Sequence, residues 1–220
     1  MQPIRVDIWS DIACPWCFIG KRKFDAGLAD FSADPANPPV EVTFHSFELS
    51  PDTPVDFDGG EVAFLVQHKG MAAAEVRNML NQVTDIAAQV GLNYDFGALK
   101  HTNTVLAHQL LHFAKSQGVQ REAYERLFTA YFEEGRHVGR VPDLADLAAD
   151  IGLDRTAAVT ALESGEFLPA VRADQQLAAE YGIRGVPCFV LDERYEITGA
   201  RDPAVFVEAL TSLVAERSER

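Results

Sequence analysis

A pair of closely spaced cysteines near the start of the chain constrains its fold more than any other sequence feature. The run Cys14-Pro15-Trp16-Cys17 follows residues 4–9, where apolar side chains alternate with others as in a half-buried strand. It leads into residues 15–31, where apolar side chains recur at helical spacing, and Pro15 suits the first turn of such a helix. The sequence therefore predicts a strand, a cysteine pair and a helix in direct succession.

The rest of the chain completes an α/β order. Alternation and turn residues predict a second strand over 40–47, and apolar periodicity broken at glycines predicts five to seven helices over 61–182. Two short strands, 186–191 and 195–198, are expected to form a hairpin. A last helix is expected from residue 202 or 203 to residue 215.

This order of β-α-β, a helical block and β-β-α is that of a thioredoxin-like fold with a large all-helical insertion. The chain has no internal repeat, low-complexity segment or flexible linker, so the block is expected to be an insertion rather than a detached unit. The expected domains are a discontinuous thioredoxin-like domain, residues 1–60 and 183–220, and a helical insertion domain, residues 61–182.

The placement of the pair predicts different roles for the two thiols. Cys14 stands at the helix N-terminus, where unpaired N–H groups and the helix dipole favour a thiolate, so it is the expected nucleophile. Cys17 lies one turn further on and is the expected resolving thiol, less exposed than its partner, which attacks a mixed disulfide at Cys14. The alternatives are two structural cysteines or half of a zinc site. A four-ligand zinc site needs a second pair, which the chain lacks, so no metal site is expected.

Net charge and apolar content narrow the range of partners. The formal charge of -14 argues against nucleic acid, because such binding depends on Lys and Arg neutralising phosphates. No apolar run approaches the ~20 residues of a membrane span, and the first residues lack the apolar centre of a secretory signal. We therefore expect a cytoplasmic protein with neither nucleic acid nor membrane as its partner.

A second motif lies far along the chain, where Gly185-Val186-Pro187 opens a predicted strand. Proline is rare inside strands. Either a trans-proline starts the strand, or a cis-proline exposes the Val186 main chain to an extended substrate beside Cys14. Cys188 follows directly. We expect it to be a small buried hydrophobe, with disulfide exchange with the pair as the alternative.

Motifs spread over nearly the whole chain carry a family resemblance. They are Asp7-Ile8-Trp9-Ser10-Asp11 running into Cys14-Pro15-Trp16-Cys17-Phe18-Ile19-Gly20-Lys21, Phe47-Glu48-Leu49-Ser50-Pro51, Asn103-Thr104 with Ala107-His108, Gly185-Val186-Pro187 and Thr198-Gly199-Ala200. Together they resemble the DsbA-like branch of the thioredoxin superfamily. Within it, the chain resembles the FrnE-like group related to 2-hydroxychromene-2-carboxylate isomerases and kappa-class glutathione transferases. The resemblance implies a cis peptide bond at Pro187, an active-site face bordered by the helical insertion, and dithiol–disulfide chemistry at Cys14.

Two departures from the related patterns refine this expectation. Relatives that act on small molecules with glutathione usually have serine where this chain has Cys14, so the dithiol favours redox chemistry. Periplasmic DsbA oxidases typically have histidine next to the second cysteine, where this chain has Trp16. We therefore expect a potential in the reducing half of the range of roughly -120 to -270 mV.

The resemblance also marks candidate substrate-binding residues: Pro15, Trp16, Val186 and Pro187 near the pair, and Asn103 and His108 in a region that faces the cleft of similar proteins. For the last two the alternative is structural, namely capping of a helix by Asn103 or Thr104 and a hydrogen-bonded core histidine. His108 and His112 have the spacing of a metalloprotease helix, but Gln109 replaces the glutamate that such chemistry needs, which excludes it.

Charged residues near the pair have simpler expectations. Asp11 is expected to be a solvated loop charge, with proton relay to Cys17 as the alternative. Lys21 and Arg22 are expected to form an exposed helix face, with attraction of anionic glutathione as the alternative.

The function that the sequence favours is a disulfide oxidoreductase or isomerase acting on protein or small-thiol disulfides. It is expected to hold no bound cofactor, to take glutathione as a co-substrate if any, to exchange electrons with a cellular reductant or oxidant, and to be a monomer or homodimer. The alternatives are a glutathione-dependent isomerase or transferase and a non-catalytic peptide-binding or chaperone module.

Overall fold

The protein is described by a computed structural model that covers residues 2–218. A single four-stranded mixed sheet organises this part of the chain, with strand order β2-β1-β3-β4. The strands are β1 (Ile4–Ser10), β2 (Val40–Ser46), β3 (Cys188–Leu191) and β4 (Tyr195–Thr198). β2 runs parallel to β1, whereas β3 and β4 form an antiparallel hairpin that joins the other side of β1. The predicted α/β thioredoxin-like fold is confirmed.

The central strand β1 is buried on both faces, and the alternation of its side chains sets what each face packs against. Ile4, Val6 and Ile8 belong to the main core, whereas Trp9 belongs to a smaller cluster on the opposite face. A parallel neighbour requires a crossover, which is supplied by helix α1 (Pro15–Ser32). Cys14 therefore lies where the central strand passes into the crossover helix.

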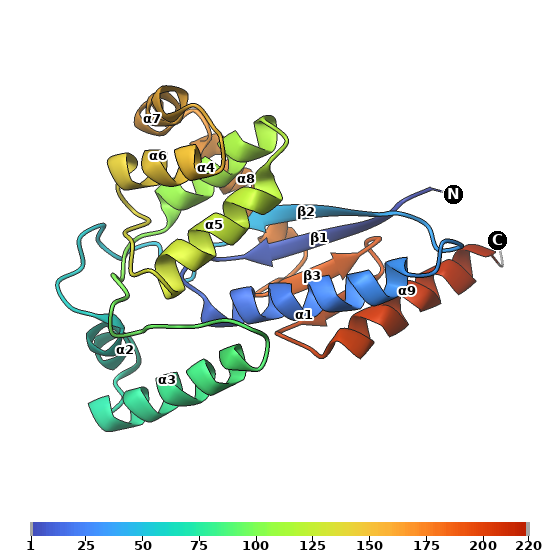
Figure 1. Ribbon diagram of the computed structural model, residues 1–220, viewed down its shortest axis with the longest axis horizontal. Helices are drawn as coiled ribbons and strands as arrows, with labels where there is room; N and C mark the ends of the chain where they lie inside the picture. The colour runs from blue at the N-terminus through green and yellow to red at the C-terminus, as the bar shows by residue number, and fades with distance from the viewer. Residues whose placement is uncertain (1, 219–220) are drawn as a thin grey trace.

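Helix α1 and the last helix, α9 (Pro203–Ser218), lie side by side on one face of the sheet (Figure 1). Their closest approach is at Gly27, where a Cβ atom would lie 2.6 Å from the carbonyl oxygen of Pro203. A side chain at position 27 would therefore force the two helices apart.

Seven helices separate β2 from β3, at the upper end of the predicted range, and all lie within the described residues. They are α2 (Glu61–Lys69), α3 (Ala73–Ala88), α4 (Val105–Ser116), α5 (Gln120–Phe132), α6 (Val141–Asp150), α7 (Arg155–Ser164) and α8 (Leu168–Glu180). Figure 1 shows that they gather around the end of the sheet at which β1 runs into α1. We call them the helical segment. The predicted domain limits at residues 60/61 and 182/183 stay a prediction.

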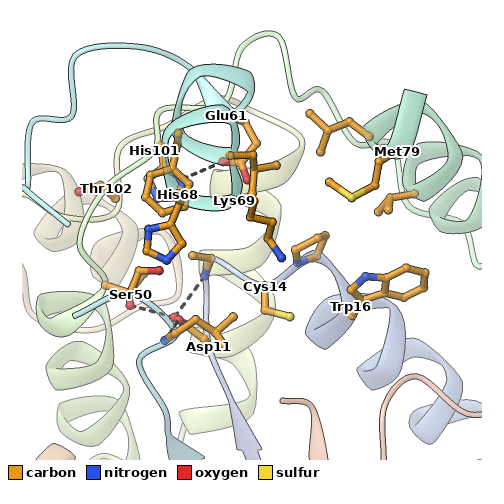
Figure 2. A pocket seen from close by; sticks show the side chains of 18 residues that line it. Asp11, Cys14, Trp16, Ser50, Glu61, His68, Lys69, Met79, His101 and Thr102 are labelled. Atoms are coloured by element: carbon orange, nitrogen blue, oxygen red, sulfur yellow. Dashed lines mark hydrogen bonds and ion pairs between the residues drawn. The ribbon is translucent and has the colours of Figure 1, made fainter. Parts of the chain in front are cut away.

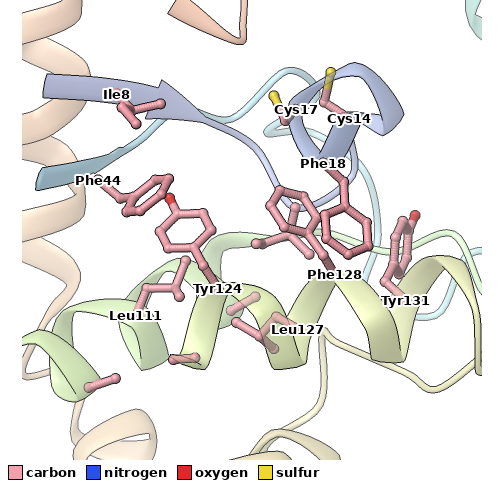
Figure 3. Close-up of a cluster of buried hydrophobic side chains, with 14 of the residues drawn as sticks. Ile8, Cys14, Cys17, Phe18, Phe44, Leu111, Tyr124, Leu127, Phe128 and Tyr131 are labelled. Carbon is pink, nitrogen blue, oxygen red and sulfur yellow. The ribbon is translucent and has the colours of Figure 1, made fainter. Parts of the chain in front are cut away.

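The main hydrophobic core is continuous from the sheet into the helical segment. Phe44 of β2 packs on Tyr124 of α5 with ring centroids 4.2 Å apart, and Phe18 of α1 stacks on Phe128 at 4.9 Å. Figure 3 shows this row of rings running from the sheet to the start of α1, directly beneath the two cysteines. Large aromatic side chains bury much apolar area, so this contact fixes the helical segment against the cysteine pair.

A buried polar cluster joins α8 to the sheet. Asp174 of α8 accepts hydrogen bonds from the main-chain N–H of Ser46 at 2.8 Å, and it contacts His45 Nδ1 at 2.7 Å and His112 Nε2 at 3.0 Å. The other ring nitrogen of His45 lies 2.9 Å from Asp7 of β1. We call these side chains the α8 cluster.

The ends of the elements match the sequence predictions to within one residue, with two differences. The last helix runs to Ser218 rather than to residue 215. The third strand begins at Cys188 rather than at residue 186, because Val186 and Pro187 form a loop in front of it. No helix among the described residues is long and apolar enough to cross a membrane.

Candidate active site

Cys14 ends the loop that joins β1 to α1, and Cys17 lies in the first turn of α1. We call residues 11–17 the reaction loop. Cys14 is the N-cap residue of this 18-residue helix, with an extended backbone at φ -93° and ψ 111°. Its N–H donates to the carbonyl of Asp11 at 3.1 Å, and its own carbonyl accepts the N–H of Cys17 at 3.0 Å. The Cys14 thiol is thus held at the positive end of the helix dipole.

Both cysteines are free thiols within reach of one another. Their exposed fractions are 5% for Cys14 and 3% for Cys17, so exposure hardly separates them. Burial, followed by the hydrogen bond and charge of Cys14, raises the pKa of the Cys17 thiol. A thiol that resists deprotonation is suited to wait until its partner has reacted.

The loop before β3 closes over Cys14 from the other side. The Cys14 thiol donates to the carbonyl of Val186, with 3.7 Å between sulfur and oxygen. The Val186–Pro187 peptide bond is cis, as the family resemblance implies. Helix α1 packs closely on this loop, because a Cβ atom at Gly20 would lie 2.9 Å from Cγ of Pro187.

A cavity of about 290 Å³ opens beside Cys14, between the reaction loop and the first helices of the helical segment. Pro15 and Trp16 line it together with Cys14, and Trp16 stands at its rim with 40% of its surface exposed. The opposite wall comes from α2 and α3, including Phe64, Leu80 and Val83. Figure 2 shows the Lys69 side chain directed from α2 toward Cys14. Cys17 is not among the lining residues, so the cavity gives access to Cys14 alone.

Asp11 is the first residue of the reaction loop and is nearly fully buried, with 1% of its surface exposed. Its carboxylate accepts hydrogen bonds from the Leu49 N–H and the Thr104 hydroxyl, both at 2.8 Å, and from the Ala13 N–H at 3.3 Å. Nε2 of His108 lies 3.3 Å from the same carboxylate. The expectation of a solvated loop charge was wrong, because helix α4 and the loop after β2 cover this side chain.

The surroundings of Asp11 favour its ionised form despite this burial. Burial alone raises the pKa of a carboxyl group, but the hydrogen bond and charge of His108 and the bonds from Leu49 and Thr104 outweigh it. The pKa of Asp11 therefore lies below its ordinary value.

The candidate substrate contacts Asn103, which precedes α4, and His108, on α4, are not among the residues that line the cavity. His108 is completely buried and reaches Asp11, so the structure supports the core-histidine alternative over substrate contact. Asn103 accepts the Val105 N–H at 2.9 Å and donates to the Pro51 carbonyl at 2.8 Å, which holds the start of α4. Among the lining residues, this region contributes His101, Thr102 and Thr104 instead.

Two further expectations about charged and thiol side chains have clear outcomes. Lys21 is buried, not exposed, because α5 covers that side of α1. Its ammonium group donates a hydrogen bond to the Glu125 carboxylate at 3.0 Å. Arg22 is partly buried over the Phe18 ring and donates to the same carboxylate. Cys188 is a buried hydrophobe of the Trp9 cluster, on the face of the sheet opposite the main core.

Two buried contacts in the site were missed by sequence reasoning. Glu61 and His101 form a buried pair, 2.7 Å apart, in the cavity wall, and the His101 ring stacks on Phe64. The Tyr94 hydroxyl donates to the Pro15 carbonyl at 2.8 Å and so supports the first turn of α1. No local sequence pattern predicts either contact, because Glu61 and His101 are 40 residues apart and Pro15 and Tyr94 are 79 residues apart.

Comparisons with known proteins agree on the fold. The model of the DSBA-like thioredoxin domain family matches residues 5–211. The solved structure of a probable DsbA oxidoreductase from Streptomyces coelicolor, SCO1869, has a TM-score of 0.90 and 36% sequence identity. The match covers 97% of this chain and 91% of the chain in that structure.

Two other similar proteins add less about chemistry. An uncharacterized protein of Bacillus subtilis (strain 168), YwbO, is 27% identical over 210 residues, which are 94% of this chain and 96% of that protein. The structure of a 2-hydroxychromene-2-carboxylate isomerase has a TM-score of 0.74 at 15% identity and covers 98% of each chain. At that identity the likeness concerns the fold alone.

Proposed function

Because the chain belongs to the family of DSBA-like thioredoxin domains, we propose that it is a thiol–disulfide oxidoreductase acting through Cys14 and Cys17. The observation that carries the proposal is the Cys14 thiol at the N-terminus of α1, beside a second thiol and open to a cavity. The sequence motifs further support membership of the FrnE-like group.

In the reductive direction the Cys14 thiolate attacks one sulfur of a substrate disulfide. A bond forms between Cys14 and that sulfur, and the other substrate sulfur leaves with the electron pair and takes up a proton. Cys17 then loses its proton and attacks the Cys14 sulfur. The second step releases the remaining substrate thiol and leaves a Cys14–Cys17 disulfide. The raised pKa of Cys17 supports this order, because it leaves Cys14 as the thiol that reacts first.

The proposed substrates are disulfides of proteins or of small thiols. The exposed Trp16 ring and the apolar cavity wall offer a surface for the substrate next to the reacting sulfur. Pro15 lines the same cavity, and the carbonyl of Val186, which precedes Pro187, accepts the hydrogen bond of the Cys14 thiol. We propose all three as substrate-binding residues. We further propose a cytoplasmic protein, monomeric or homodimeric, that draws on a cellular reductant or oxidant. Glutathione is the proposed small co-substrate, and no bound cofactor takes part.

Reduction of insulin disulfides in a glutathione buffer tests the proposal. The Cys14→Ser variant is expected to lose activity, and Cys17→Ser is expected to lose turnover while accumulating mixed disulfides at Cys14. Cys188→Ser is the matched control, because it removes the third thiol without touching the loop, and it is expected to keep the wild-type rate. Full activity in Cys14→Ser would refute the proposal, and glutathione-dependent turnover without Cys17 would favour the isomerase or transferase alternative.

A further inference from the structure

We propose that Asp11 is a positioning residue that holds the Cys14 thiol against Cys17, and that helix α4 takes part in the redox centre through it. This inference rests on the proposed disulfide exchange and deepens it. It assigns a role to a buried carboxylate and to a helix of the helical segment that do not themselves touch the reacting sulfurs.

The main chain of Asp11 is linked to both cysteines. Its carbonyl accepts the Cys14 N–H at 3.1 Å, and the Cys14 carbonyl in turn accepts the Cys17 N–H at 3.0 Å. A change in the orientation of this one residue therefore alters the position of each thiol. The orientation of Asp11 in turn depends on what holds its side chain.

Three separate segments hold that side chain. Ala13 belongs to the reaction loop itself, Leu49 to the loop after β2, and Thr104 and His108 to the start of α4. Four donors converge on one carboxylate, and bonds to a charged acceptor are stronger than neutral ones. The carboxylate therefore acts as a fixed point for the loop between β1 and α1.

The use of Thr104 is the most specific sign of this role. Thr104 is the N-cap residue of α4, where a threonine hydroxyl ordinarily accepts an N–H of its own helix. Here the hydroxyl makes no such cap and donates to Asp11 instead, while Asn103 accepts the Val105 N–H. The Thr104 hydroxyl therefore does not cap α4 and instead makes a bond to the reaction loop.

Burial supports the same interpretation. Removing a carboxylate from water costs several kcal/mol unless the surrounding bonds compensate, and an apolar residue would fill the space at lower cost. Asp11 has a cluster of donors that match it, at the one loop whose geometry sets the distance between two reacting thiols. Holding two reacting groups in the right geometry speeds their reaction, and this gain offsets the cost of burying the carboxylate.

The quantity that positioning controls is the effective concentration of Cys17 toward Cys14. It is defined by the exchange in which Cys17 attacks the mixed disulfide of Cys14 with glutathione. The bond between Cys14 and glutathione breaks, the bond between Cys17 and Cys14 forms, and the glutathione sulfur leaves with the electron pair and receives the Cys17 proton. A misplaced Cys14 lowers the equilibrium constant of this exchange without changing the chemistry of either thiol.

The experiment measures this constant in mixtures of reduced and oxidised glutathione, with acid quenching, alkylation and mass analysis of the full-length protein. Asp11→Ala is expected to lower the effective concentration by roughly tenfold to a hundredfold, the range that small misplacements of reacting groups produce. Thr104→Val, which removes one donor and keeps the shape, is expected to lower it by about threefold to tenfold. Thr104→Ser keeps the hydroxyl and is expected to match the wild type.

Asp174→Asn is the matched control, because Asp174 is another buried carboxylate with a main-chain donor and histidine partners, and it contacts neither cysteine. It is expected to destabilise the fold and leave the effective concentration unchanged. An unchanged constant in Asp11→Ala, or an equal loss in Asp174→Asn, overturns the proposal.

Should Asp11→Ala fail to fold, the Thr104 pair decides. A loss in the valine variant with none in the serine variant supports the proposal, and equal behaviour of the two overturns it. A wild-type protein that forms no Cys14–Cys17 disulfide at any glutathione ratio refutes the proposed function itself. That outcome is distinct from a wild-type disulfide that the Asp11 variants leave unaltered.

Discussion

Asp11 and Asp174 have the same kinds of hydrogen-bond partner but lie in different regions of the molecule. Each is a buried carboxylate that accepts a main-chain N–H from the segment at the end of β2, and each contacts a histidine of α4. These histidines, His108 and His112, are one helical turn apart, so a single face of α4 serves both carboxylates. Figure 2 shows Asp11 beside Cys14, whereas the α8 cluster contains no cysteine.

The difference teaches that burial and a shifted pKa do not by themselves mark a functional residue. The pKa of Asp174 is also lowered, since the bonds from His112 and His45 outweigh the effect of burial. Structural networks perturb pKa values as active sites do. What separates Asp11 is covalent and hydrogen-bonded continuity with the two thiols.

The largest expected effect is on stability and comes from the α8 cluster. Asp174→Ala leaves His45, His112 and the Ser46 N–H buried without their acceptor, and loss of one partner from a buried pair costs about 3–5 kcal/mol. Urea denaturation measures the free energy of unfolding. The folded variant is expected to keep the disulfide exchange rate of the wild type. A loss below 1 kcal/mol would mean that water reaches the cluster and replaces the carboxylate.

The two histidines of α4 allow a sharper comparison. His108→Ala and His112→Ala each remove a donor from a buried carboxylate, so each is expected to cost about 1–3 kcal/mol in the free energy of unfolding. Only His108→Ala is expected to lower the effective concentration of Cys17 toward Cys14 as well. The two variants are compared by urea denaturation and by glutathione equilibria on the same samples. An equal loss of effective concentration in both would show that α4 acts as a whole and not through Asp11.

A smaller effect is expected on the pH dependence of stability, and it comes from the α8 cluster. Burial lowers the pKa of His45, but the hydrogen bonds and charges of Asp174 and Asp7 outweigh it, so the pKa of His45 is raised. A raised pKa contributes stability that is fully present below the unfolded value of about 6.5 and is lost as pH rises through the folded value. The lowered pKa of Asp174 contributes stability above about 3.9 that is lost as pH falls through its folded value.

The α8 cluster is therefore expected to stabilise the fold most between about pH 4 and 6.5. The difference in unfolding free energy between the wild type and His45→Gln is expected to shrink as the pH rises from 6 to 9. Urea denaturation at a series of pH values measures it. A difference that stays constant over this range would mean that His45 does not change its charge there.

The sequence predicted the parts of the site that depend on local order. The strand, the Cys14-Pro15-Trp16-Cys17 run and the helix are neighbours along the chain, so periodicity and Pro15 were sufficient to place them. The hairpin from β3 to β4 followed for the same reason. The cis bond at Pro187 came from the family resemblance and not from residue physics, which left trans and cis open.

The parts that escaped depend on contacts between distant segments. Asp11 looks like any loop aspartate in the sequence, because the donors Thr104 and His108 are 93 and 97 residues away. Lys21 was misjudged for a similar reason, since its cover is α5. One of its two carboxylate partners, Asp25, lies one turn away in α1, but the other, Glu125, is 104 residues away. The spacing of His108 and His112 was visible, but what each ring binds became clear only when α4 was set against both carboxylates.

The smallest expected effect concerns the third thiol and tests whether chemistry is confined to the reaction loop. Cys188 packs among Trp9, Ile183 and Val190, and burial, together with the charge of Glu196, raises the pKa of its thiol to about 12. A thiol in this state is a poor nucleophile near neutral pH. Cys188→Ala is therefore expected to leave disulfide exchange unchanged and to cost about 1 kcal/mol in the free energy of unfolding, the scale set by one small buried group.

Alkylation of Cys188 in the native protein is expected to proceed only at the rate of unfolding, whereas Cys14 reacts directly through the cavity. Rapid alkylation of Cys188, or slower exchange in the alanine variant, would mean that the chemistry is not confined to the reaction loop.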